Sequence, residues 1–179
     1  MLRDDEMSPP DNIPPDERAK LSDRAVLLAA AKWFLEEARK VEEVSQIALI
    51  GSLTTRKTIP KDVDLVVTLK SSAGFKQIAT LARKLQGRIQ KGSLGADVFI
   101  VHDNIYIGRA CHYREPWERV ECRRRHLKCS RDVEFLCNTV SSFRLREEII
   151  LRPPLVLWPD VVINVALPED VIECFGLSK

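Results

Sequence analysis

The sequence lacks features that would assign it to several common classes of protein. No apolar run approaches the roughly 20 residues that cross a bilayer, and the first twenty residues contain no apolar segment typical of a secretory signal. The formal net charge is only +2, so the overall charge does not indicate a polyanionic partner. We therefore expect a cytoplasmic protein, without contact with a membrane.

The five cysteines include no CxxC pair, which weakens the case for a zinc site. Four of them fall within residues 111–137, beside two histidines. In a reducing compartment such a cluster is more often metal-binding or buried than disulfide-bonded. Zinc takes four S or N ligands, commonly from local pairs, and Cys122, His126 and Cys129 have suitable spacing. Buried cysteines are the favoured interpretation, and zinc is the alternative.

Composition divides the chain into three parts. Residues 1–21 carry four prolines among acids, with too few apolar groups to offset the entropy of ordering, and predict a flexible arm. Residues 22–110 carry the helix and strand patterns of one domain. Residues 111–179 are predicted to be a Cys-, His- and Arg-rich extension that packs on the sheet. Basic residues gather at 119–131, which favours a solvated face, with nucleic-acid binding as the alternative.

The pattern of residues 22–110 predicts an α/β (α+β) fold, a small mixed sheet with flanking helices. Ser22 is a candidate N-cap, and apolar residues follow it at helical spacing. A second helix is expected after Ser72, ended by Gly87. Strands are predicted at 46–50, 62–69, 96–101 and 105–109, an edge segment or extended tail at 151–158, one more strand at 161–167 and a helical turn from Pro168.

Two short motifs lie at the ends of neighbouring predicted strands. Gly51 can let another group approach the backbone closely, and Ser52 offers a hydroxyl and an N–H to an anion such as phosphate. Asp62 and Asp64 are two residues apart on a strand, so they share one face with Cα atoms roughly 6.5 to 7 Å apart. Both can converge on Mg²⁺, which prefers oxygen ligands and often retains substrate phosphates in its shell.

This pattern resembles a known signature. An apolar residue, Gly-Ser, nine residues and then Asp-Val-Asp-Leu are similar to the motif of the polymerase-β-like nucleotidyltransferase superfamily, and most like its minimal nucleotidyltransferases. In that family two acids hold Mg²⁺, the Gly-Ser turn contacts the nucleoside triphosphate (NTP), and a third acid on a later strand completes the site. The resemblance implies catalytic, metal-binding roles for Asp62, Asp64 and Asp97, with Asp97 helping to hold a second metal ion and deprotonating the acceptor, and NTP contacts at Gly51 and Ser52.

The resemblance covers about residues 22–110 and implies metal-dependent transfer of a nucleoside monophosphate from an NTP to an acceptor hydroxyl. Arg56 or Lys57 could reach a phosphate. The chain departs from many active members in having Lys61, not serine, before the first acid. The alternative is a catalytically silent protein of the same fold that binds nucleic acid or a small partner protein, as in toxin and antitoxin modules. Asp103, a rival for the third acid, is predicted to lie in a turn.

Overall fold

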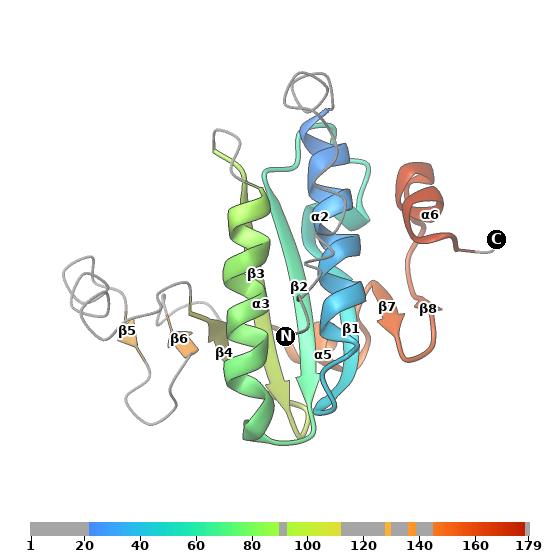
Figure 1. Cartoon of the computed structure of the whole chain (residues 1–179). Coiled ribbons are helices and arrows are strands. Elements are labelled where there is room, and N and C mark those ends of the chain that lie inside the picture. The colour runs from blue at the N-terminus through green and yellow to red at the C-terminus, as the bar shows by residue number, and fades with distance from the viewer. Residues whose placement is uncertain (1–21, 90–92, 112–127, 130–135, 139–144, 178–179) are drawn as a thin grey trace, which may run out of the picture.

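The computed structural model describes residues 22–89, 93–111, 128–129, 136–138 and 145–177. The fold is mixed α and β, as predicted: one sheet in the order β5-β6-β4-β3-β2-β1-β7-β8, with flanking helices (Figure 1). The strands are β1 (Val44–Ile50), β2 (Asp62–Leu69), β3 (Gly95–His102), β4 (Ile105–Ala110), β5 (Lys128–Cys129), β6 (Leu136–Asn138), β7 (Leu155–Trp158) and β8 (Val162–Ile163). The helices are α2 (Asp23–Ala38), α3 (Phe75–Arg88), α5 (Glu147–Leu151) and α6 (Glu169–Phe175), and two short 3₁₀ helices are η1 (Gly51–Thr54) and η2 (Ser72–Gly74).

The two long helices begin close to where the sequence predicts. The Ser22 hydroxyl accepts a hydrogen bond from the Ala25 amide at 3.2 Å, which confirms the predicted N-cap of α2. The helix α3 follows η2 directly. Gly87 does not end α3, because it lies within the helix, which continues to Arg88. None of the helices in the described ranges is long and apolar enough to span a membrane.

The centre of the sheet combines an antiparallel and a parallel pair of strands. β1 runs antiparallel to β2, with Ile50 opposite Asp64. β3 runs parallel to β2, a pairing that requires a crossover connection, here provided by α3. This register places Asp97 beside Asp64 and Gly95 beside Asp62. The three acids thus meet where β1 ends and where β2 and β3 begin.

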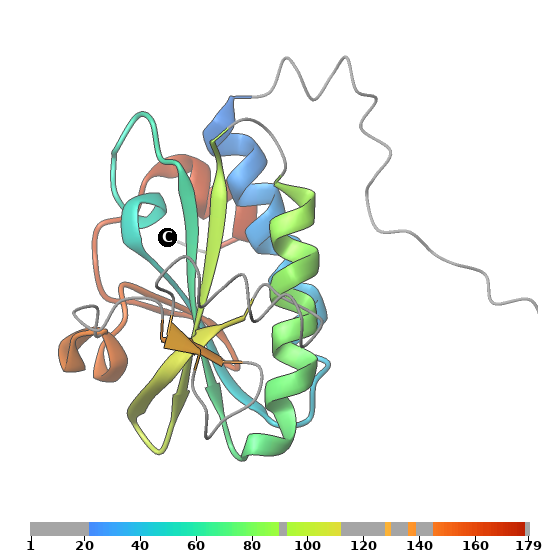
Figure 2. The ribbon, with the colours of Figure 1, turned by 90° about the vertical axis from the view of Figure 1, so that its left-hand side faces the viewer.

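The two faces of the sheet are covered differently. Helices α2 and α3 lie on one face and α5 lies on the other (Figure 2). The first face holds the larger core, in which Phe34 of α2 and Leu65 of β2 are fully buried. The second face has a smaller apolar cluster that includes Val66 and Phe99. Since side chains alternate along a strand, Asp62 and Asp64 lie on this second face with Val66.

The segments after residue 110 extend the sheet at both edges. β6 pairs with β4 at one edge, and β7 pairs with β1 at the other. β7 falls within the predicted edge segment, whereas the strand predicted at 161–167 shortens to the two residues of β8. The helix α6 begins after Pro168, where a helical turn was expected, and its buried Val171 joins the larger core. Residues 1–21, the predicted arm, lie outside the described residues.

Candidate active site

The carboxylate of Asp64 lies directly against the backbone of Gly51. Gly51 has a φ of +73°, and a Cβ atom added to it would stand 2.1 Å from Asp64 Oδ2. Both the left-handed backbone and the close contact therefore require glycine at this position. The expected close approach to Gly51 is confirmed, and the approaching group is the second acid of the Asp-Val-Asp motif.

The first acid also lies over a glycine. A Cβ atom on Gly95, the neighbour of Asp62 across β2 and β3, would stand 2.7 Å from Asp62 Oδ1. Asp62 itself is exposed, while Asp64 is half-buried. Gly51 and Gly95, which lack side chains, thus leave room for the two carboxylates to lie against the backbone.

The third predicted acid, Asp97, is held by an arginine. Arg109 of β4 donates from Nη1 to Asp97 Oδ1 in an ion pair whose side chains are 23% and 29% exposed, respectively. The Nε atom of Arg109 is buried and has no hydrogen-bond partner among the described residues. Sequence reasoning missed Arg109. The available signal was a single charged residue in the otherwise uncharged strand Ile105–Ala110.

The electrostatics of the three acids raise the proton affinity of the central one. Burial, and then the negative charges of Asp97 and Asp62, raise the pKa of Asp64 to about 6. Within the described residues, no group of three or more His, Cys, Asp or Glu side chains forms a ready metal-binding set. Asp62 and Asp64 still offer the oxygen donors that Mg²⁺ prefers, and a cation there would offset the repulsion.

The turn that carries Gly51 and Ser52 is fixed by its own threonines. Thr54 is buried, and its hydroxyl donates to the Gly51 carbonyl at 2.8 Å. The hydroxyl and amide of Thr55 both donate to the Ser52 carbonyl, at 2.8 and 3.2 Å. Ser52 is half-buried at the start of this turn. The hydrogen bonds hold the segment in one conformation beside the acids.

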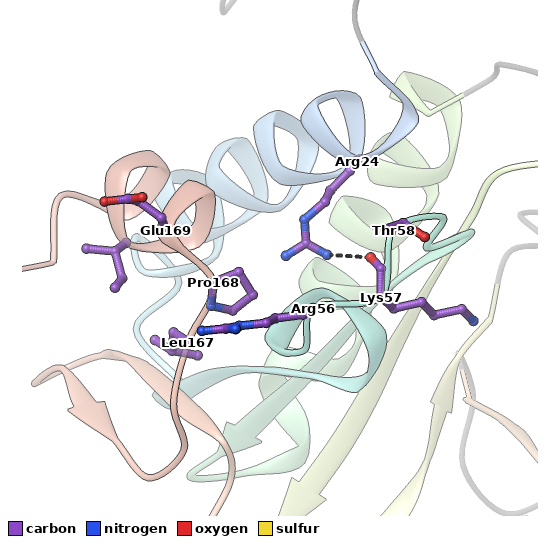
Figure 3. A pocket seen from close by; sticks show the side chains of 8 residues that line it. Arg24, Arg56, Lys57, Thr58, Leu167, Pro168 and Glu169 are labelled. Atoms are coloured by element: carbon purple, nitrogen blue, oxygen red, sulfur yellow. Dashed lines mark hydrogen bonds between the residues drawn. The ribbon is translucent and has the colours of Figure 1, made fainter.

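Arg24 at the start of α2 ties the same turn to the C-terminal helix. Its Nη2 donates to the Leu53 carbonyl at 2.9 Å and its Nη1 to the Lys57 carbonyl at 3.2 Å, the latter bond drawn in Figure 3. The same guanidinium forms an ion pair with Asp170 of α6. Arg24 is a second residue that sequence reasoning missed. Its partners are distant in the chain, so the residues around Arg24 do not indicate them.

Arg56 lines a cavity that the three acids do not line. The cavity has a volume of about 650 Å³ and lies between the start of α2, the loop after η1 and the start of α6. Figure 3 shows the Arg56 side chain directed toward Leu167 and Pro168. The remaining lining residues are Arg24, Lys57, Thr58, Glu169 and Ile172. The structure therefore brings Asp62, Asp64 and Asp97 together with Gly51, but does not place Arg56 in that group.

The cysteine and histidine cluster falls almost wholly outside the described residues. Cys111 is buried at the end of β4. Of the three residues with zinc-like spacing, Cys122 and His126 lie outside the described ranges, and only the backbone of Cys129 is described, in β5. The zinc alternative remains a prediction from sequence. The same holds for nucleic-acid binding by residues 119–131, which lie largely outside these ranges.

Comparison with known proteins places the chain in a family. Residues 14–128 match the model of a family described as a family of unknown function (DUF6932), and the chain belongs to this family. The match includes the Gly51 turn, all three acids and Arg109. No curated protein and no solved structure matches the chain.

Proposed function

We propose that the protein is a metal-dependent nucleotidyltransferase that transfers a nucleoside monophosphate from an NTP to an acceptor hydroxyl. One observation carries the proposal: the Asp64 carboxylate lies against the left-handed Gly51 turn and beside Asp97 of the parallel strand. A turn able to accept phosphate and a group of carboxylates are thus built into one end of the sheet. Such sites suit phosphoryl chemistry because charge stabilisation supplies most of the catalysis.

Each residue has a specific task in this proposal. Asp62 and Asp64 would hold Mg²⁺, whose chemistry is to neutralise phosphate charge and polarise the phosphorus centre. The Gly51 and Ser52 turn would contact the triphosphate through backbone N–H groups and the serine hydroxyl. Asp97 would complete the acidic group beside Asp64, as the resemblance to nucleotidyltransferases implies.

The proposed reaction is a single displacement at the α-phosphorus. The acceptor oxygen forms a new bond to this atom, while the bond to the oxygen that bridges to the β-phosphorus breaks. Pyrophosphate leaves with the electrons of that bond, and the proton of the acceptor hydroxyl is released. The fixed turn contributes by holding the triphosphate in line, which lowers the entropic cost of reaching the transition state.

The direct experiment measures Mg²⁺-dependent NTP binding and turnover. Purified protein is incubated with each labelled NTP and a cell lysate, and the labelled product is sought. The variant Asp64→Asn is expected to abolish binding and transfer. Asp103→Asn is the matched control, because Asp103 is an exposed acid of the turn between β3 and β4, with a φ of 50°. Equal activity in Asp64→Asn and wild type would overturn the proposal.

A catalytically silent protein of the same fold is the second candidate. The observation that favours it is the pairing of Asp97 with Arg109, which engages the third acid. Such a protein would use its surface to bind nucleic acid or a small partner protein. It would show no pyrophosphate release with any NTP, with or without the lysate, even where Mg²⁺ and NTP bind. Turnover therefore separates the two candidates.

A further inference from the structure

The ion pair between Asp97 and Arg109 changes the charge balance of the proposed site. Asp62, Asp64 and Asp97 carry three negative charges when ionised, and Arg109 supplies one positive charge. The four groups together sum to −2 before any substrate binds. One divalent cation balances that charge, whereas a second would leave an excess of positive charge beside the guanidinium.

To bind a metal ion, the Asp97 carboxylate would have to divide its charge between the ion and Arg109, or break its ion pair with Arg109. The Arg109 side chain is only 23% exposed, so its charge is partly removed from water. Removing the partner of such a group leaves an uncompensated charge at a poorly hydrated position, which is costly. Arg109 also retains several N–H donors, including the buried Nε, since a guanidinium has five. The pair is therefore a fixed part of the site.

We propose that Arg109 takes the place of a second metal ion, so that the site binds a single divalent cation through Asp62 and Asp64. Asp97 is then a positioning residue, which holds the Arg109 guanidinium on the acidic face of the sheet. This inference rests on the proposed function and specifies its metal content. It also assigns the two acids of β2 and the acid of β3 to different tasks.

The first test counts bound metal. The full-length chain is titrated with Mn²⁺ alone, and free Mn²⁺ is followed by electron paramagnetic resonance. We expect one ion per chain. Two ions per chain would overturn the inference and leave the proposed function standing. Absence of Mn²⁺ binding would overturn the metal-dependent function and the inference with it, so the two failures are distinguishable.

The second test compares the acids. Asp64→Asn is expected to weaken Mn²⁺ binding by roughly a hundredfold. Loss of a residue that only supports a metal ligand already weakens binding by about 10- to 100-fold, and loss of the ligand itself should cost at least as much. Asp97→Asn removes only a neighbouring negative charge and no metal ligand, so it is expected to weaken Mn²⁺ binding by no more than roughly tenfold. Equal losses in both variants would show that Asp97 is a ligand and would overturn the inference.

The third test alters the arginine. Arg109→Gln removes a positive charge and releases Asp97, so we expect Mn²⁺ to bind roughly tenfold more tightly. A tenfold change in Kd corresponds to the interaction energy that shifts a pKa by about one unit. Arg109→Lys keeps the charge and should retain the wild-type Kd and stoichiometry, which provides a readout if the glutamine variant fails to fold. A lysine variant that binds two ions, or a folded glutamine variant with unchanged Kd, would contradict the assigned role.

Discussion

The two faces of the central sheet serve different purposes. The face under α2 and α3 holds the larger core, in which Leu49, Leu65 and Ile100 of the sheet and Phe34 of α2 are buried. The opposite face has a smaller apolar cluster and, where β2 and β3 begin, like charges crowded against glycine backbone. The first arrangement stabilises the fold, while the second stores repulsion that a bound cation would relieve. Substitutions on the two faces should therefore separate stability from ligand binding.

The largest effect on stability is expected from the core under the helices. Phe34→Ala removes a fully buried ring and should lower the free energy of unfolding by about 3–5 kcal/mol. Chemical denaturation measures this loss. The Mn²⁺ affinity of the molecules that remain folded should be unchanged, since Phe34 lies on the opposite face from the acids. A large loss of Mn²⁺ affinity would show that the two faces are coupled.

Gly51→Ala should damage both stability and ligand binding. The left-handed backbone and the contact with Asp64 Oδ2 together should cost about 2–4 kcal/mol. Displacement of the Asp64 carboxylate should also weaken Mg²⁺ and NTP binding. Gly87→Ala is the matched control, because Gly87 lies within α3 with open space around it, and it should stabilise by about 0.5–1 kcal/mol. Similar effects of the two substitutions would contradict the role of Gly51.

Asp64→Asn should stabilise the protein above pH 6 in the absence of divalent cations. The folded-state pKa of about 6 exceeds the ordinary value of 3.8, so the folded protein retains a proton that the unfolded chain releases. Stability contributed by this carboxyl group is therefore present below pH 4 and lost as the pH rises through 6. The gain in the variant should be on the order of 2 kcal/mol at pH 8 and near zero at pH 4.

Thermal melts of wild type and Asp64→Asn across this pH range provide the measurement. Mg²⁺ should raise the melting temperature of wild type at pH 8 but not that of the variant. A variant less stable than wild type at pH 8 would show that Asp64 makes a favourable contact that outweighs its burial.

The smallest effect is expected at the connection between the turn and α6. Arg24→Gln removes an ion pair with Asp170 and hydrogen bonds to two carbonyls, and should cost about 1 kcal/mol or slightly more. Because Arg24 contacts the carbonyls of Leu53 and Lys57, NTP affinity should fall as well. Binding titrations and melts of Arg24→Gln beside Asp170→Asn check this. Unchanged NTP affinity in Arg24→Gln would limit Arg24 to a structural role.

Local patterns predicted the centre of the fold well and its edges poorly. β2 begins at Asp62 and ends at Leu69 as expected, because polar and apolar residues alternate at both ends of the strand. β5, β6 and β8 are only two or three residues long, and such strands depend on pairing with a neighbour. No local periodicity identifies β5 or β6, and the strand predicted at 161–167 is longer than the two residues of β8.

The same distinction applies to the candidate site. Asp62 and Asp64 share a face by strand geometry alone, and the pairing of β2 with β3 places Asp97 beside Asp64. Arg109 reaches Asp97 only because β4 pairs with β3 in a particular register, which residues 105–110 do not specify. The pairing of strands, and not the local sequence pattern, therefore determines that the Arg109 guanidinium contacts Asp97.

The parallel pairing of β2 and β3 also affects the order of folding. Asp64 and Asp97 are 33 residues apart in the chain, with α3 between them, so they meet only after the crossover is complete. Contacts that close such long loops form slowly, whereas the antiparallel pairing of β1 and β2 closes a shorter one. Refolding without a divalent cation thus brings like charges together in its later steps. We expect added Mg²⁺ to accelerate those steps and leave the early formation of the β1 and β2 hairpin unchanged.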